Sequence, residues 1–116
     1  MAMDERERRL GMNEAVFREV NERVEEVHEK FGSGTGPLVI ICECGVLSCT
    51  ERISVPIAEY ERVRGDATHF LLQVGHEDPT VERMIENHGT YIVVEKEGMD
   101  VEEVAEATDP RRDDRE

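Results

Sequence analysis

Apolar residues near the N-terminus recur at intervals of seven, three, four, three and four positions. They are Leu10, Phe17, Val20, Val24, Val27 and Phe31. This alternation, in a stretch from Asp4 to Phe31 without proline, predicts one long amphipathic helix with Asn13 at the single polar position of the stripe. The stripe can pack along a sheet of the same domain, or it can form the seam of a dimer in which Asn13 fixes the register.

Shorter apolar and β-branched runs follow this helix, and glycine and proline separate them. The pattern predicts strands at 38–41 and 52–55, a helix at 56–64, a strand at 69–74, a helix at 78–88, a strand at 91–94 and a helix at 100–107. The first two strands form a hairpin whose connection carries every cysteine of the chain. We therefore expect the α+β class, with a long N-terminal helix and a small, mostly antiparallel sheet of about four strands that short helices cover on one face.

The composition divides the chain into four segments. The long amphipathic helix occupies residues 1–31, and a flexible connector with three glycines and a proline occupies 32–37. Residues 38–108 form the predicted metal-binding α+β domain. Residues 109–116 are mostly charged and carry no apolar anchor, so we expect a disordered tail there.

The chain of 116 residues has room for one modest core, since 36% of its residues are charged, 38% are hydrophobic and none is tryptophan. A bound metal would help such a small domain to stay folded. The net charge of −14 disfavours direct contact with nucleic acid or anionic lipid, because both bind cationic surfaces. The acidity favours solubility, and docking on a basic protein partner is its functional alternative.

The first residues lack the basic and apolar segments of an export signal, and no apolar run has the length of a membrane span. We therefore expect a cytoplasmic protein whose thiols stay reduced and which does not contact membranes. Three cysteines also cannot all pair with one another, which disfavours a framework of disulfides.

Cys42, Cys44 and Cys49 lie within eight residues. Residues two apart in a strand point to the same side, so Cys42 and Cys44 share one face, and Gly45 lets the chain reverse. Thiolates this close repel one another unless a cation neutralises them, and zinc accepts thiolate and imidazole ligands in a tetrahedron. The spacing C-x-C-x4-C therefore predicts a zinc site at the end of the hairpin. The alternative is three buried cysteines that act as small apolar residues.

His76 is the predicted fourth ligand, because it directly follows a strand and Gly75 allows a tight approach. His69, in the same predicted strand, is the alternative ligand. With four protein ligands the site is closed and structural. Glu43 and Glu77 flank ligands and could serve a catalytic metal. However, Glu43 points to the strand face opposite the cysteines, and Glu77 belongs to the start of the predicted helix at 78–88.

An iron–sulfur cluster with Cys3His ligation is the alternative cofactor. Such ligation occurs in the family of small proteins with a CDGSH motif, in which the histidine lies inside C-D-G-x-H. Here Thr50 and Glu51 follow Cys49, so that pattern is not met. The sequence also lacks a phosphate-binding loop, a dinucleotide fingerprint and a G-x-S-x-G nucleophile motif.

The stretch 13–23, the pattern C-x-C-x4-C and the triplet Gly75-His76-Glu77 together resemble a group of small acidic proteins of unassigned function from high-GC Gram-positive bacteria. The resemblance covers the chain from the long helix to Val94 and implies no activity. The residues themselves predict a non-catalytic, zinc-stabilised module. It would bind a protein partner, or a second copy, through the helix bearing Phe17, Val20, Val24 and Val27. The alternatives are a redox or metal-sensing protein that uses an iron–sulfur cluster or free thiolates, and a small metalloenzyme.

Overall fold

The computed structural model describes residues 4–31 and 36–115. Its elements in chain order are α1 (Glu5–Phe31), β1 (Leu38–Ile41), β2 (Arg52–Val55), α2 (Ile57–Arg64), β3 (His69–Leu72), β4 (Glu82–Asn87), β5 (Ile92–Lys96), α3 (Met99–Ala107) and the 3-10 helix η1 (Arg112–Arg115). Residues 32–35 of the predicted connector lie outside the described part of the chain. None of the helices described is long and apolar enough to cross a lipid bilayer.

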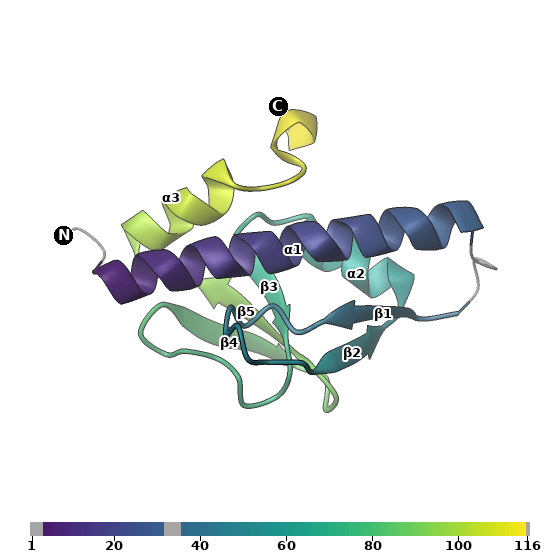
Figure 1. Ribbon diagram of the computed structural model, residues 1–116, viewed down its shortest axis with the longest axis horizontal. Coiled ribbons are helices and arrows are strands. Elements are labelled where there is room, and N and C mark those ends of the chain that lie inside the picture. Colours follow the sequence, from purple (N-terminus) through teal and green to yellow (C-terminus); the bar gives the residue numbers. More distant parts are fainter. Residues whose placement is uncertain (1–3, 32–35, 116) are drawn as a thin grey trace.

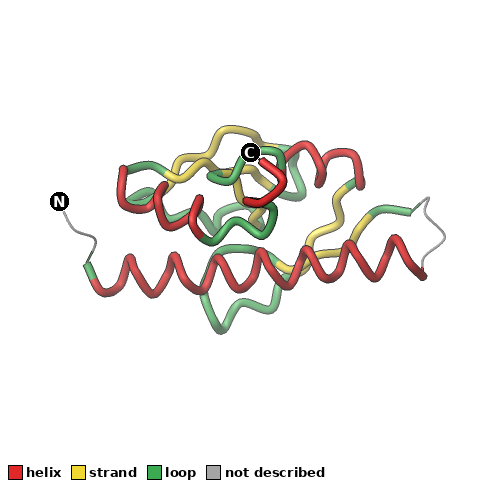
Figure 2. Tube along the Cα trace, turned by 90° about the horizontal axis from the view of Figure 1, so that it is seen from above, coloured by secondary structure: helices red, strands yellow, loops and turns green. Residues whose placement is uncertain are grey.

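The strands form two antiparallel sheets, the hairpin β1–β2 and a three-stranded sheet in the order β3–β5–β4. The long helix α1 runs across both sheets on one side, and α3 packs beside its N-terminal half (Figure 1, Figure 2). The α+β class and the hairpin are therefore confirmed. In place of the predicted single sheet of about four strands, the described residues form one sheet of two strands and one of three.

The helix α1 faces the sheets with charged and amide side chains. Its buried positions are Glu14, Ala15, Arg18, Asn21, Glu22 and Glu25. The predicted apolar stripe is turned away from the sheets in part, since Val20 is 40% exposed and Val27 is 56% exposed. The helix thus packs along its own domain, as one alternative predicted, but through a different face.

Partners in other elements satisfy the buried polar and charged side chains of α1. Lys96 of β5 lies between Glu14 of α1 and Glu82 of β4, and all three side chains are buried. The guanidinium of Arg18 lies 4.5 Å from the centre of the Phe70 ring and donates hydrogen bonds to two backbone carbonyl oxygens. These contacts replace the water that the charges lose on burial, and they tie α1 to the three-stranded sheet.

The cluster around Lys96 makes the stability of the protein depend on pH. Burial raises the pKa of the Glu14 carboxyl to about 8, although the Lys96 ammonium acts in the opposite sense. The folded state therefore keeps a proton that the unfolded chain releases near its ordinary pKa, and the resulting stabilisation is lost as pH rises through about 8. Between about pH 7 and pH 9 the loss amounts to about 1 kcal/mol.

Glu14→Gln is therefore expected to flatten this pH dependence, because a neutral amide resembles the protonated carboxyl. Urea unfolding of both proteins at the two pH values measures the difference. Glu19→Gln, on the exposed side of the same helix, is the matched control. An unchanged pH slope in Glu14→Gln would contradict the expectation.

Residues 82–87 form strand β4, so the predicted helix at 78–88 is wrong. The carboxylate of Asp78 does not cap a helix but accepts hydrogen bonds from the backbone N–H and the hydroxyl of Thr80 in a turn. The residues that follow pair antiparallel with β5, with one irregularity between Met84 and Glu86. Aspartate followed by proline begins turns as well as helices, and the pairing with β5 decides between them here.

The tail that we expected to be disordered over 109–116 packs on the helices as far as it is described. Arg111 forms ion pairs with Glu22 and Glu25 of α1 and with Glu61 of α2, at 2.8, 3.0 and 2.7 Å. Asp109 is buried. Charge-assisted hydrogen bonds hold this tail in place. The prediction of disorder considered apolar anchors alone and so missed these bonds.

Candidate metal centre

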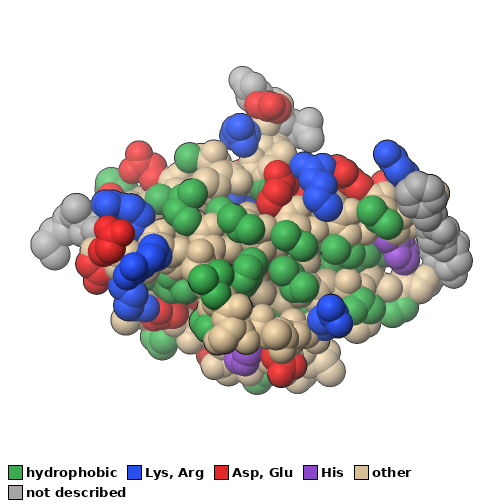
Figure 3. Space-filling model, viewed as in Figure 1, with side chains coloured by type: hydrophobic (Ala, Val, Ile, Leu, Met, Phe, Trp, Pro, Cys, Tyr) green, Lys and Arg blue, Asp and Glu red, His purple; other side chains and the backbone are tan. Residues whose placement is uncertain are grey.

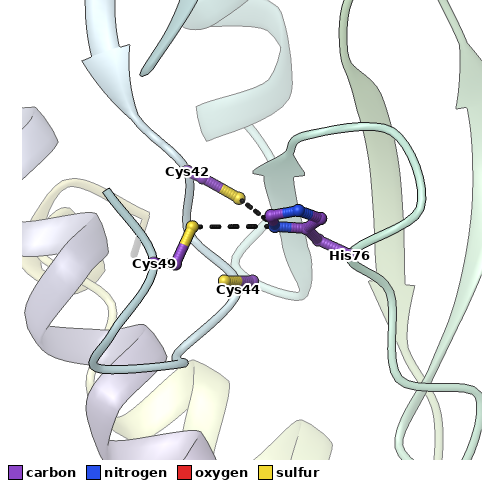
Figure 4. A group of neighbouring side chains, drawn as sticks. All are labelled: Cys42, Cys44, Cys49 and His76. Carbon is purple, nitrogen blue, oxygen red and sulfur yellow. Dashed lines mark hydrogen bonds between the residues drawn. The ribbon is translucent and has the colours of Figure 1, made fainter. Parts of the chain in front are cut away.

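The predicted ligands come together at the end of the β1–β2 hairpin (Figure 4). Cys42 follows β1 directly, and Cys44 and Cys49 lie in the loop between β1 and β2. His76 reaches the same point from the turn after β3. The three sulfur atoms and one imidazole nitrogen all lie within 4.8 Å of one another. The structure brings His76 to the cysteines, and it places His69 in a separate group.

The distances match those between ligands of one tetrahedral ion. Nδ1 of His76 lies 3.5 Å from Sγ of Cys42 and 3.6 Å from Sγ of Cys49, the two contacts drawn in Figure 4. Bonds of about 2.3 Å to sulfur and 2.0 Å to nitrogen, at tetrahedral angles, put two such ligand atoms roughly 3.5 Å apart. The imidazole and these thiols therefore have the spacing that a zinc ion requires.

The same distances bear on the iron–sulfur alternative. In a two-iron cluster each iron binds its own pair of ligands, and the width of the cluster separates one pair from the other. Here all four ligand atoms lie within 4.8 Å of one another, which fits a single ion better than two. A single iron ion can bind in the same tetrahedron. The distances therefore favour one metal ion over a cluster, and they do not distinguish zinc from iron.

Asn21 of α1 holds the strand that leads into the site. Its side-chain N–H donates to the carbonyl oxygen of Ile41, and its side-chain oxygen accepts the N–H of the same residue, both at 2.9 Å. Asn21 thus acts as a strand neighbour for the residue that precedes Cys42. Since Asn21 is fully buried, the position of Cys42 depends on the packing of α1.

Glu43, between the first two cysteines, is fully buried, and its carboxylate accepts two hydrogen bonds of 2.8 Å from Arg64 in a bidentate ion pair. The same carboxylate accepts the backbone N–H of Leu71 at 2.9 Å. The backbone N–H of Glu43 in turn donates to the carbonyl oxygen of Leu71, also at 2.9 Å. The loop is thereby fixed to α2 and β3, and this carboxylate is engaged away from the ligands.

Two glycines set the direction of the chain at the site. Gly45 has a φ of +79°, and a β-carbon there would lie 2.7 Å from Cγ of Glu14 and 2.8 Å from Cδ1 of Leu10. The amide of Asn13 donates a hydrogen bond of 3.0 Å to the carbonyl oxygen of Gly45. The loop therefore packs directly on α1. Gly75, with a φ of +88°, allows the tight turn that precedes His76.

Cys42 and Cys44 lie in a buried apolar cluster with side chains from β3, β5 and α3. Burial raises the pKa of both thiols, so without a cation they keep their protons at neutral pH. The backbone N–H of Gln73 donates to Sγ of Cys42 at 3.1 Å and stabilises negative charge on that sulfur. A divalent ion reverses the preference, because the thiolates are then its ligands.

His69 and Glu77, the other candidate site residues of the sequence, lie outside the cluster of cysteines and His76. Nε2 of His69 lies 3.1 Å from Glu95 and 3.5 Å from Asp66. Glu77 does not begin a helix, and its Oε1 is buried without a hydrogen-bond partner among the described residues.

The sequence did not reveal three residues that position the ligands, namely Asn21, Arg64 and Gln73. One signal was present for Arg64. Glu43 lies between two predicted metal ligands, and a carboxylate that is buried with them requires a cation or several N–H donors.

No protein-family model, curated protein or solved structure matches this chain.

Proposed function

We propose that this chain is a protein-interaction module whose fold is held by one structural zinc ion. Cys42, Cys44, Cys49 and His76 bind the ion. The observation that supports this most strongly is the agreement of the nitrogen–sulfur distances with a tetrahedral site. Four protein ligands leave no position for a reactive water, and this is typical of structural zinc and not of catalytic zinc.

The proposed ion links parts of the chain that belong to different sheets. The cysteines lie at the end of the β1–β2 hairpin, and the histidine follows β3 of the other sheet. A small domain in which 36% of the residues are charged gains stability from such a link. Three free thiols suit a reducing compartment, so the proposed location is the cytoplasm.

The surface proposed for a partner is the outward side of α1, which carries exposed apolar side chains among its charged ones. Met12, Val16, Val20 and Val27, here called the α1 ridge, are between 40% and 56% exposed. Apolar side chains gather along α1 in the space-filling view (Figure 3). A row of exposed apolar side chains on one helix is a candidate interaction site.

Untagged protein purified without added metal is expected to be colourless and to contain one equivalent of zinc. Native mass spectrometry and an absorption spectrum measure this. Loss of one ligand weakens the site, so His76→Ala is expected to reduce zinc retention against a competing chelator by at least about tenfold.

His69→Ala is the matched control, because this imidazole lies beside Glu95 and not beside the cysteines. It is expected to retain zinc like the unchanged protein. A preparation that contains no metal would remove the proposed centre. Equal zinc retention in the two histidine variants would remove His76 from the ligand set.

A redox sensor that uses the same thiolates is the second candidate function. Cys49 and His76 are only half-buried, so small oxidants can reach this side of the centre. Iron with visible absorption, or release of zinc by mild peroxide, would favour this candidate over the structural one.

A further inference from the structure

We propose that the α1 ridge docks on the ridge of a second copy of this chain, with the two helices antiparallel and related by a two-fold axis. The proposal rests on the proposed function, because it names the partner of that interaction surface.

The positions of the ridge residues fit a two-fold pair. Met12, Val16 and Val20 are spaced by four residues and form a line along the outer side of α1, which Val27 extends. Val16 and Val20 lie on either side of the midpoint of the helix Glu5–Phe31. Two antiparallel helices that meet at their midpoints therefore place Val16 of each copy opposite Val20 of the other. A two-fold interface requires this kind of self-complementary surface.

The exposed charges beside the ridge favour antiparallel over parallel helices. Glu5 and Arg8 lie near the start of α1, and Glu26 and Lys30 lie near its end. An antiparallel pair brings Glu5 toward Lys30 of the second copy and Arg8 toward its Glu26, whereas a parallel pair places like charges together. This local complementarity offsets part of the repulsion between two chains that each carry a net charge of −14.

The metal-binding loop extends the docking surface. Gly45 packs against α1 at Leu10 and Asn13, and the loop then projects past the outer side of the helix (Figure 2). Here Leu47 is 75% exposed and Val46 is 49% exposed. In the antiparallel pair, Leu47 of each copy lies beside the C-terminal half of α1 in the other copy. The zinc centre therefore holds a part of the interface in place.

Sedimentation velocity of the zinc-loaded full chain, over a concentration series, is expected to show a shift from the monomer mass to the dimer mass. Val16→Glu places a charge at the centre of the interface and raises the dissociation constant at least about tenfold. Met84→Glu is the matched control, since Met84 is an apolar residue of β4 that is 44% exposed. It is expected to leave the dissociation constant unchanged.

Charge reversal tests the orientation of the helices. Arg8→Glu alone weakens the dimer, and the double variant Arg8→Glu, Glu26→Arg restores it, because both pairs across the interface are then reversed. A double variant as weak as the single one would overturn the antiparallel arrangement.

The zinc content of every sample separates this proposal from the proposed function. A monomer at all concentrations that retains one zinc overturns self-association and leaves the metal centre standing. Absence of zinc in every preparation overturns the metal centre itself.

Discussion

Cys44→Ser is expected to abolish tight zinc binding and to lower the free energy of unfolding by at least about 4 kcal/mol at saturating zinc. A thousandfold loss of affinity corresponds to this amount, because metal that binds only the folded state stabilises it by mass action. A serine hydroxyl is a much poorer zinc ligand than a thiolate. Cys44 is also 3% exposed and lies in an apolar cluster, so the new hydroxyl is buried without an assured partner.

Urea unfolding of both proteins, once with zinc and once with a chelator, measures this effect. The chelator is the control, because it removes the metal from both proteins and leaves only the cost of burying the hydroxyl. The two unfolding curves are then expected to differ by this cost alone. Equal stability of the two proteins in the presence of zinc would show that the metal does not hold the fold.

Glu43→Ala is expected to lower the free energy of unfolding by about 3 to 5 kcal/mol, because it leaves the buried guanidinium of Arg64 without its counter-ion. Arg64 is 2% exposed and Glu43 is fully buried, so water cannot replace the lost carboxylate without opening the core. The N–H of Leu71 and the side chain of Asn21 lose an acceptor as well. Since this network fixes the backbone between the cysteines, the variant is also expected to hold zinc less tightly.

Glu19→Ala is the matched control for this variant. Glu19 pairs with Arg23 on the exposed side of α1, where its side chain is 48% exposed, and such pairs contribute about 0 to 1 kcal/mol. The double variant Glu43→Ala, Arg64→Met is expected to be more stable than Glu43→Ala, because it also removes the buried charge that the Glu43 carboxylate balanced. A Glu43→Ala protein as stable as Glu19→Ala would contradict the structural role of the ion pair.

The candidate site was largely predictable from the sequence because its determinants are local. Two cysteines separated by one residue share a strand face, and a glycine after them permits the return of Cys49. His76 could be predicted as the fourth member because it follows a strand and lies beside Gly75. The structure brings these four side chains together, whereas their binding of zinc stays a proposal.

The orientation of α1 was not predictable in the same way, because hydrophobic periodicity assigns charged residues to solvent. Glu14 is buried because Lys96 lies beside it, and these two residues are far apart in the sequence. The helix predicted at 78–88 failed for a related reason. Its apparent cap at Asp78 is a turn, and pairing with β5, a later segment of the chain, makes the following residues a strand.

The pairing of Asn21 with Ile41 has a consequence for aggregation. Among the described residues, β1 has a strand neighbour only in β2, and an open strand edge offers free N–H and C=O groups to other molecules. The side chain of Asn21 forms hydrogen bonds with both the N–H and the C=O of Ile41. The carbonyl oxygen of Leu71 accepts the N–H of Glu43. A side chain of a helix therefore blocks strand addition at the point where the hairpin enters the loop that carries Cys44 and Cys49. The protein thus exposes apolar side chains along α1 while this part of its hairpin edge stays closed to fibril-like growth.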